Sequence, residues 1–189
     1  MANPNGTPDK NLISFYETDS GKNITQPDLD ASGGGFTAAV KITSHCANFT
    51  ITGDRWVGGA ESVVDINNEC ENVKVACSEF VVPPGAKYAL SSKTCNGVTF
   101  EGKIVGRPTQ YALNLGSWSD QSSATQHGTQ LNLTADNYPI VVWVGNAVKP
   151  KVLNNPSFYK FRGFGLLGSP IREIVMFFWG VLKKLGIPV

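Results

Sequence analysis

The central part of the chain alternates short apolar runs with groups of turn residues. From Phe36 onward, β-branched and aromatic stretches are interrupted by turn residues, as at Pro83-Pro84-Gly85 and Asn96-Gly97. Short strands that recur about every 8 to 12 residues are typical of a sandwich or barrel. We therefore expect a mainly β protein with a single antiparallel β-sandwich of the jelly-roll or immunoglobulin-like class. Its expected strands cover residues 36–44, 49–52, 62–66, 73–77, 80–82, 87–91, 98–105, 110–115, 130–134 and 140–144.

The end of the chain shows a helical period instead. A wheel of about 100° per residue places the large apolar residues between Ile171 and Leu185 on one arc about 200° wide. Ser169 and Pro170 are suited to the N-cap and the first helical position, and Gly186 can end the helix. We therefore predict an amphipathic α-helix over residues 170–187.

These patterns divide the chain into four segments. Residues 1–34 are rich in Asn, Gly, Pro, Asp and Ser, and we expect them to form a flexible N-terminal arm. Residues 35–148 form the expected sandwich, and residues 149–169 form a connector rich in aromatic and basic residues. The helix over 170–187 follows. No internal repeat is apparent.

The charges are distributed unevenly. From Lys149 onward there are seven basic residues and one acidic residue, Glu173, a net charge of +6. The preceding part has nine basic and fourteen acidic residues, a net charge of −5. This asymmetry favours a tail that meets an anionic surface or docks on its own acidic body. We expect no nucleic-acid partner, because the basic residues of the tail are interleaved with apolar ones.

Four cysteines lie close together in the chain, and none of the spacings is the C-x-x-C of a zinc or redox site. An even number within one stretch favours two disulfides. In an antiparallel sandwich the turns that hold Cys46 and Cys70 lie at one end, and Cys77 and Cys95 flank a single hairpin. Among three possible connectivities we therefore predict Cys46–Cys70 and Cys77–Cys95.

The composition is consistent with a secreted glycoprotein. Asn-X-Ser/Thr sequences occur at Asn5, Asn23, Asn48 and Asn132, although such triplets also arise by accident. Residues 1–26 are polar and do not resemble a signal peptide, so a secreted origin requires that a leader has been removed. The longest apolar stretch, residues 174–182, is far shorter than the roughly 20 residues of a membrane span.

Residues that could perform catalysis do not converge in the sequence. The two histidines, His45 and His127, are far apart, and no G-x-S-x-G element is present. The acidic residues of the turns complete neither a glycosidase pair nor a calcium loop, and no P-loop or dinucleotide motif occurs. We expect no enzymatic activity, no cofactor and no metal site.

Two tryptophans in predicted loops are candidate ligand-binding residues. Arg55 and Trp56 lie in a glycine-framed loop, and Trp118 and Asp120 lie in a second loop. An exposed indole beside polar groups can stack on a sugar or sit at a lipid headgroup. The alternative is that each indole folds back over the sandwich edge.

The tail is the strongest candidate interaction surface. Its aromatic residues in the connector are interleaved with basic ones, as in a belt at the headgroup level, and its helix combines an apolar arc with a basic face. The alternative is a helix packed on the sandwich, and burial of Ile174, Phe178 and Leu182 would decide between the two. The candidate membrane-binding residues are Phe158, Tyr159, Lys160, Phe161, Arg162, Phe164, Ile174, Phe177, Phe178, Trp179, Val181, Leu182, Lys183 and Lys184.

A small sandwich with a lipid-seeking helix resembles the actinoporins, a family of small cytolysins, and more loosely the lipid-binding aegerolysins of fungi. Actinoporins have their amphipathic helix at the amino end and typically lack cysteines, whereas this chain has a carboxyl-terminal helix and four cysteines. The resemblance is one of architecture, so it implies membrane binding without assigning roles to residues.

Two hypotheses follow. The first is a secreted protein that binds anionic lipid through its carboxyl-terminal tail and acts as a cytolysin, toxin or effector. The second is a lectin-like or protein-binding module, in which the helix packs on the domain, binds a protein partner or mediates oligomerisation, and the tryptophan loops recognise a glycan or protein.

Overall fold

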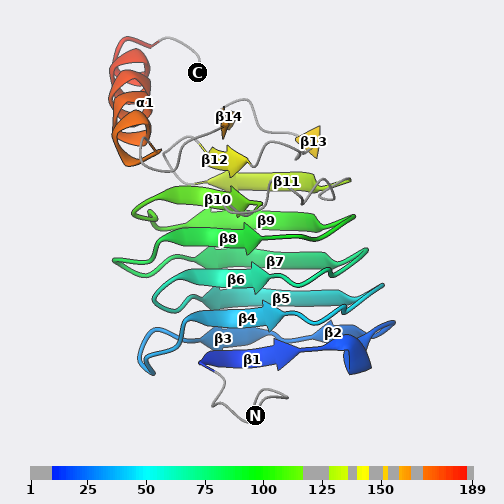
Figure 1. Cartoon of the computed structure of the whole chain (residues 1–189). Coiled ribbons are helices and arrows are strands. Elements are labelled where there is room, and N and C mark those ends of the chain that lie inside the picture. The colour runs from blue at the N-terminus through cyan, green and yellow to red at the C-terminus, as the bar shows by residue number, and fades with distance from the viewer. Residues whose placement is uncertain are drawn as a thin grey trace.

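A computed structural model describes residues 10–116, 128–135, 140–144, 151–152, 158–162 and 168–186. It shows a parallel β-solenoid built of two parallel sheets, followed by one helix (Figure 1). The predictions of a mainly β protein and of a carboxyl-terminal helix are confirmed. The prediction of an antiparallel jelly-roll or immunoglobulin-like sandwich is wrong, because every strand pairing in the described part of the chain is parallel.

The chain alternates between two parallel sheets as it winds upward in Figure 1. The front sheet contains β1 (Asn11–Phe15), β4 (Ala38–Ile42), β6 (Ser62–Ile66), β8 (Tyr88–Ser92), β10 (Tyr111–Leu115), β12 (Ile140–Val144) and β14 (Phe158–Arg162). The rear sheet contains β2 (Asn23–Thr25), β5 (Thr50–Val57), β7 (Lys74–Val81), β9 (Thr99–Val105), β11 (Gln130–Ala135) and β13 (Lys151–Val152), and β3 (Asp28–Asp30) also pairs with β5. The helix α1 covers Gly168–Lys184.

Side chains of successive coils stack in columns. Val40, Val64, Leu90 and Leu113 are register partners in the front sheet, so successive coils are 24, 26 and 23 residues long. All four are fully buried, as are the columns of the rear sheet that contain residues such as Phe100. Each coil thus covers the apolar edge of the one below it, and the core runs along the solenoid axis.

Residues 10–35 form the first coil instead of the expected flexible arm. Strand β1 pairs with β4, and the short 3-10 helix η1 (Glu17–Asp19) leads to β2 and β3, which pair with β5. The ring of Phe15 lies 4.8 Å from that of Phe49, between centroids, so this coil packs on the core. Its half-buried apolar residues explain why a polar segment is ordered: it covers the amino-terminal end of the solenoid.

The turns between the two sheets contain an internal repeat that the sequence analysis missed. Segments 46–49, 70–73 and 95–98 occupy the same turn in three coils, and each reads Cys, any residue, Asn or Gly, then an apolar residue. Asn48, Asn72 and Gly97 all have a left-handed φ, of 51°, 52° and 63°. Asn and Gly adopt this conformation with the least strain, which explains their recurrence. At Gly97 a Cβ atom would also lie 2.5 Å from Oδ1 of Asn72.

The four cysteines are buried and unpaired, so the predicted disulfides Cys46–Cys70 and Cys77–Cys95 are wrong. Cys46, Cys70 and Cys95 occupy equivalent positions in successive turns, whereas Cys77 lies in β7. The thiol of Cys70 donates a hydrogen bond to the carbonyl oxygen of Asn67 at 3.1 Å, and that of Cys95 donates to Lys93 at 3.0 Å. The thiols therefore act as small buried side chains of the core.

Candidate functional site

The carboxyl end of α1 is defined by its local sequence. At the carboxyl end, the amide of Gly186 donates to the carbonyl oxygen of Lys183 at 3.1 Å, with Gly186 at a left-handed φ of 71°. This is the glycine-terminated helix end that the sequence predicts. The helix covers Gly168–Lys184 instead of the predicted residues 170–187, so Ser169 and Pro170 lie within its first turn and not at the predicted N-cap and first helical position.

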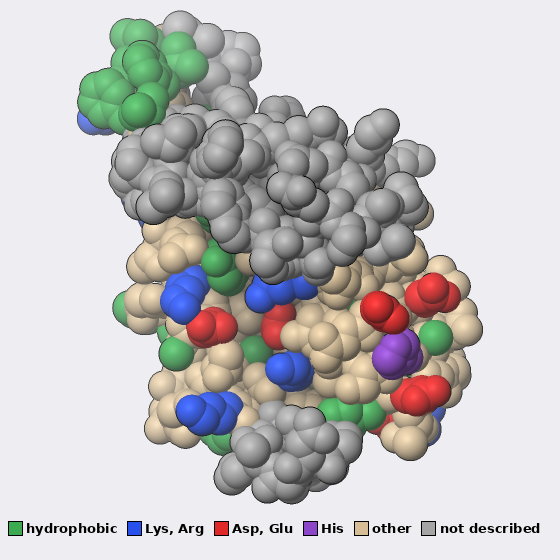
Figure 2. Space-filling view, in the orientation of Figure 1, with side chains coloured by type: hydrophobic (Ala, Val, Ile, Leu, Met, Phe, Trp, Pro, Cys, Tyr) green, Lys and Arg blue, Asp and Glu red, His purple; other side chains and the backbone are tan. Residues whose placement is uncertain are grey.

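One face of α1 consists of large apolar side chains in contact with solvent. The exposed fractions are 54% for Ile174, 66% for Phe177, 59% for Phe178, 37% for Val181 and 68% for Leu185. Their spacing places them on one arc about 100° wide at 100° per residue. We call these five residues the apolar stripe. Figure 2 shows it as a green group at the upper left of the molecule.

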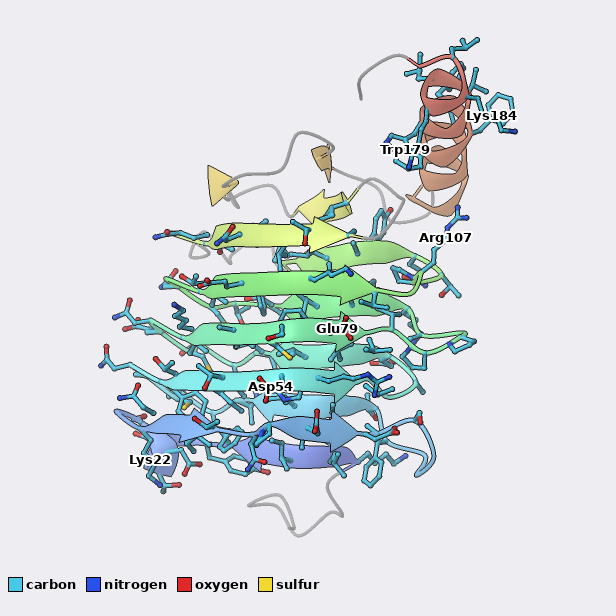
Figure 3. All side chains as sticks on the ribbon, turned by 180° about the vertical axis from the view of Figure 1, so that it is seen from behind. Lys22, Asp54, Glu79, Arg107, Trp179 and Lys184 are labelled. Carbon is cyan, nitrogen blue, oxygen red and sulfur yellow. The ribbon has the colours of Figure 1, made fainter. Side chains whose placement is uncertain are left out.

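The other side of α1 faces inward. Trp179 is half-buried and points toward the solenoid axis in Figure 3, whereas Lys184 points away from it. The indole Nε1 of Trp179 is buried without a hydrogen-bond partner, and the ammonium group of Lys183 lies 4.8 Å from the centroid of its ring. The broad apolar arc predicted from the sequence thus contains the exposed stripe and the half-buried Trp179 and Leu182, whereas the side chains of Ile171 and Val175 lie outside the described part of the structure.

These exposed fractions decide between the two alternatives left open by the sequence, a helix packed on the β domain and an exposed helix. Of the three residues that would decide between docking and exposure, Ile174 and Phe178 are exposed and Leu182 is half-buried. The stripe is therefore not covered by the solenoid. A soluble protein seldom exposes a continuous apolar face of this kind unless the face binds something.

Part of the predicted membrane belt belongs to the solenoid. Phe158, Tyr159, Lys160, Phe161 and Arg162 form β14, which pairs with β12 at the last coil of the front sheet. Their side chains lie outside the described part of the structure, and so does Phe164.

The predicted ligand-binding loop around Trp56 is a strand. Trp56 lies in β5 with no exposed surface, and its Nε1 donates a hydrogen bond to the carbonyl oxygen of Gln26 at 2.7 Å. The adjacent Arg55 is exposed and lies 3.9 Å from the carboxylate of Glu79. In this position the indole of Trp56 fills the core and offers no face to a sugar. Trp118 and Asp120 lie outside the described residues.

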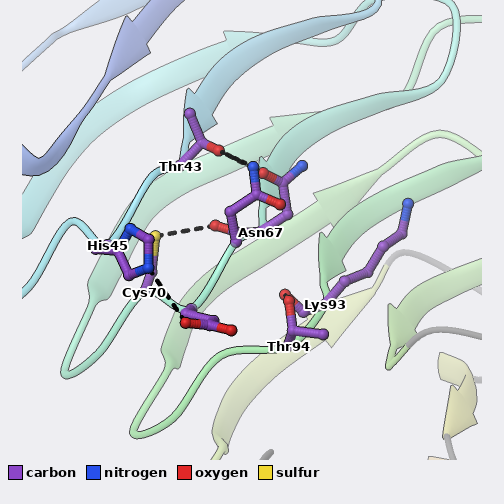
Figure 4. A network of polar contacts seen from close by, with 8 residues as sticks. Thr43, His45, Asn67, Cys70, Lys93 and Thr94 are labelled. Carbon is purple, nitrogen blue, oxygen red and sulfur yellow. Dashed lines mark hydrogen bonds and ion pairs between the residues drawn. The ribbon is translucent and has the colours of Figure 1, made fainter. Parts of the chain in front are cut away.

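The polar groups of the turns stabilise local structure. The hydroxyl of Thr43 donates to Oδ1 of Asn67 at 2.6 Å, and His45 Nε2 lies 3.2 Å from the carboxylate of Glu69 on the next coil (Figure 4). The His45–Glu69 pair is largely exposed, and such pairs contribute about 0 to 1 kcal/mol. Among the described residues, no group of three His, Cys, Asp or Glu side chains could hold a metal ion.

Burial changes the chemistry of the thiols. It raises the pKa of Cys46 to about 11 and that of Cys77 to about 11, and the neighbouring thiol of Cys95 together with burial raises the pKa of Cys70. A nucleophilic cysteine needs a lowered pKa and access to solvent. These three thiols have neither property, so they do not form a reactive site.

The function of α1 has to be inferred from its own geometry. No protein-family model, curated protein or solved structure matches the chain. In the described part of the chain, no helix has the length and apolar character needed to span a membrane. The exposed stripe of α1 is therefore the feature that any account of function has to explain.

Proposed function

We propose that the protein binds to the surface of anionic membranes by inserting the apolar stripe of α1 into the interface. The observation that supports this proposal is the exposure of five large apolar side chains on one face of a basic helix. An interfacial helix lies in the plane of the bilayer, with its apolar face in the acyl boundary and its basic residues at the headgroups.

The energetics favour this use of the stripe. Complete burial of a side chain such as Phe177 or Leu185 stabilises by about 1.5 to 3 kcal/mol, and partial insertion of five such groups contributes several kcal/mol in total. Lys183 and Lys184 are exposed at the same end of the helix. Each basic residue near an anionic leaflet contributes roughly 1 kcal/mol.

The charge of residues 149–189 favours a lipid surface over a protein groove as the partner. Residues 149–189 carry the net charge of +6, although the apolar stripe alone would suit either partner. We therefore expect binding that depends on both anionic lipid and ionic strength, as is typical of helices that combine apolar insertion with electrostatic attraction.

Sedimentation with vesicles tests the proposal. The full chain should sediment with vesicles of equal parts phosphatidylcholine and phosphatidylglycerol, less with phosphatidylcholine alone, and less at high salt. A form that ends at residue 167 retains all strands of the solenoid and should not sediment. If that form sediments as well as the full chain, α1 is not the membrane-binding element and the proposal fails.

Release of an entrapped dye from the same vesicles tests the narrower proposal of a cytolysin or toxin. Release that requires α1 would support permeabilisation. Binding without release would restrict the function to attachment at the membrane surface.

A further inference from the structure

The helix α1 lies on the same side of the molecule as one row of turns. The turns that lead from the rear sheet to the front sheet, residues 31–37, 58–61, 82–87 and 106–110, line the left side of Figure 1, and α1 stands above them. In Figure 3 Arg107, from the last of these turns, lies just below α1. We call this row the helix-side turns. The turns at residues 43–49, 67–73 and 93–98 form the opposite row.

The two rows differ in charge. The helix-side turns have small exposed tips, such as Pro84 and Gly85, and contain two basic residues and one acidic residue. The acidic residue, Glu61, is paired with Lys87, whose Nζ lies 2.7 Å from its carboxylate, and Arg107 is exposed.

The opposite row is the more acidic one. It contains the exposed Glu69 and Glu71, against the half-exposed Lys93 and against His45, whose Nε2 lies 3.2 Å from the carboxylate of Glu69. An anionic surface therefore repels the opposite row and attracts the helix-side turns, within the distance of about 8 to 10 Å over which charges act at physiological salt.

The orientation of α1 also places a bilayer on the side of the helix-side turns. Its inward face carries Trp179, and the apolar stripe faces outward, on the side of the helix-side turns (Figures 2 and 3). A bilayer that takes up the stripe consequently runs beside this row of turns. The small turn tips allow the two surfaces to approach closely.

We infer that the solenoid lies on its side on an anionic bilayer, with the helix-side turns at the headgroups and the opposite row in solvent. This inference rests on the proposed function and adds an orientation and a second contact surface to it. The partner that fits this surface is a lipid bilayer with anionic headgroups.

A fluorophore at each end of one strand provides the test. Pro84 follows β7 and Glu71 precedes it, so the single substitutions Pro84→Cys and Glu71→Cys place a label on the two rows of the same coil. The native cysteines are buried, so the unsubstituted chain measures background labelling. An environment-sensitive NBD label is read with vesicles of equal parts phosphatidylcholine and phosphatidylglycerol that contain a headgroup nitroxide lipid.

The inference predicts that the nitroxide lipid quenches the label at residue 84 several-fold more strongly than the label at residue 71. A second variant, Arg107→Glu, should weaken sedimentation with these vesicles. Equal quenching at both positions, in a protein that sediments with the vesicles, would overturn the orientation and leave the proposed function standing. A protein that does not sediment would overturn both.

Discussion

The solenoid and α1 use the same kinds of side chain in opposite ways. Phe100 of β9 has no exposed surface, because a coil lies on either side of it, whereas Phe177 of α1 is 66% exposed. Apolar side chains in the solenoid stabilise the fold, and those of the stripe contribute little to it. The difference separates the part of the molecule that folds from the part available to bind.

The contrast between the solenoid and α1 is tested most clearly by substituting one phenylalanine in each. Phe100→Ala should lower the free energy of unfolding by about 3 to 5 kcal/mol, because it removes a ring from a packed interior. Phe177→Ala should change it by no more than about 0.5 kcal/mol, because the ring is mostly in water. Denaturant titration of both variants measures the contrast. A large loss for Phe177→Ala would show that α1 packs on the solenoid.

The buried thiols make the stability of the interior depend on pH. Because the folded pKa values of Cys46 and Cys77 are raised from 9.0 to about 11, the fold favours the protonated thiols. This contribution is complete below pH 9 and is lost as the pH rises through 11. Denaturant titration under reducing conditions should therefore show stability falling over this range, with a shallower slope for Cys77→Ala.

Thiol counting gives the control for this prediction. All four cysteines should react with a thiol reagent in denaturant without prior reduction. A lower count would mean that disulfides form, contrary to the structure.

The left-handed turns of the solenoid can be tested at one residue. Asn72 has a φ of 52°, and its side-chain amide donates to Oδ1 of Asn48 at 3.2 Å. Both Asn72→Ala and Asn72→Gly lose this hydrogen bond. Alanine, unlike glycine, adopts a left-handed φ only with strain. The alanine variant should be less stable than the glycine variant by about 1 kcal/mol. Equal stabilities would contradict the explanation of the repeated Asn and Gly.

The smallest expected effect is that of Gly180→Ala on the helicity of α1. A Cβ atom added at Gly180 meets no atom within 4 Å, and alanine favours a helix over glycine by about 0.8 to 1 kcal/mol. Gly180→Ala should increase helical circular dichroism if α1 frays, and should leave vesicle binding equal or tighter. Weaker binding would indicate that Gly180 itself contacts the partner.

The sequence predicted elements better than their arrangement. Most strands lie near the predicted ranges, and the glycine at 186 located the end of the helix, because local periodicity and capping determine these features. Alternating apolar residues do not reveal whether a strand pairs with its neighbour in sequence or with the next coil. The cysteines repeated at intervals of 24 and 25 residues, each followed two positions later by Asn or Gly, carried that information.

For α1, too, the sequence predicted the element better than its surroundings. The helical period predicted the apolar arc of α1, but only the three-dimensional structure shows that its stripe is exposed while Trp179 faces inward. The Trp56 loop was misread because its flanking glycines indicated a turn, whereas Gly53 lies within β5 and approaches the indole of Trp56. Without disulfides, the proposal of secretion rests on the Asn-X-Ser/Thr sequences alone.

The most direct test of the account is the vesicle affinity of Phe177→Ser/Phe178→Ser, with Gly180→Ala as the matched control on the same helix. Both should unfold like the original chain. The double variant should bind vesicles of equal parts phosphatidylcholine and phosphatidylglycerol about tenfold more weakly or worse, since losing about 1.4 kcal/mol of insertion energy is sufficient for that change. If it binds as tightly as the control, the apolar stripe does not enter the membrane.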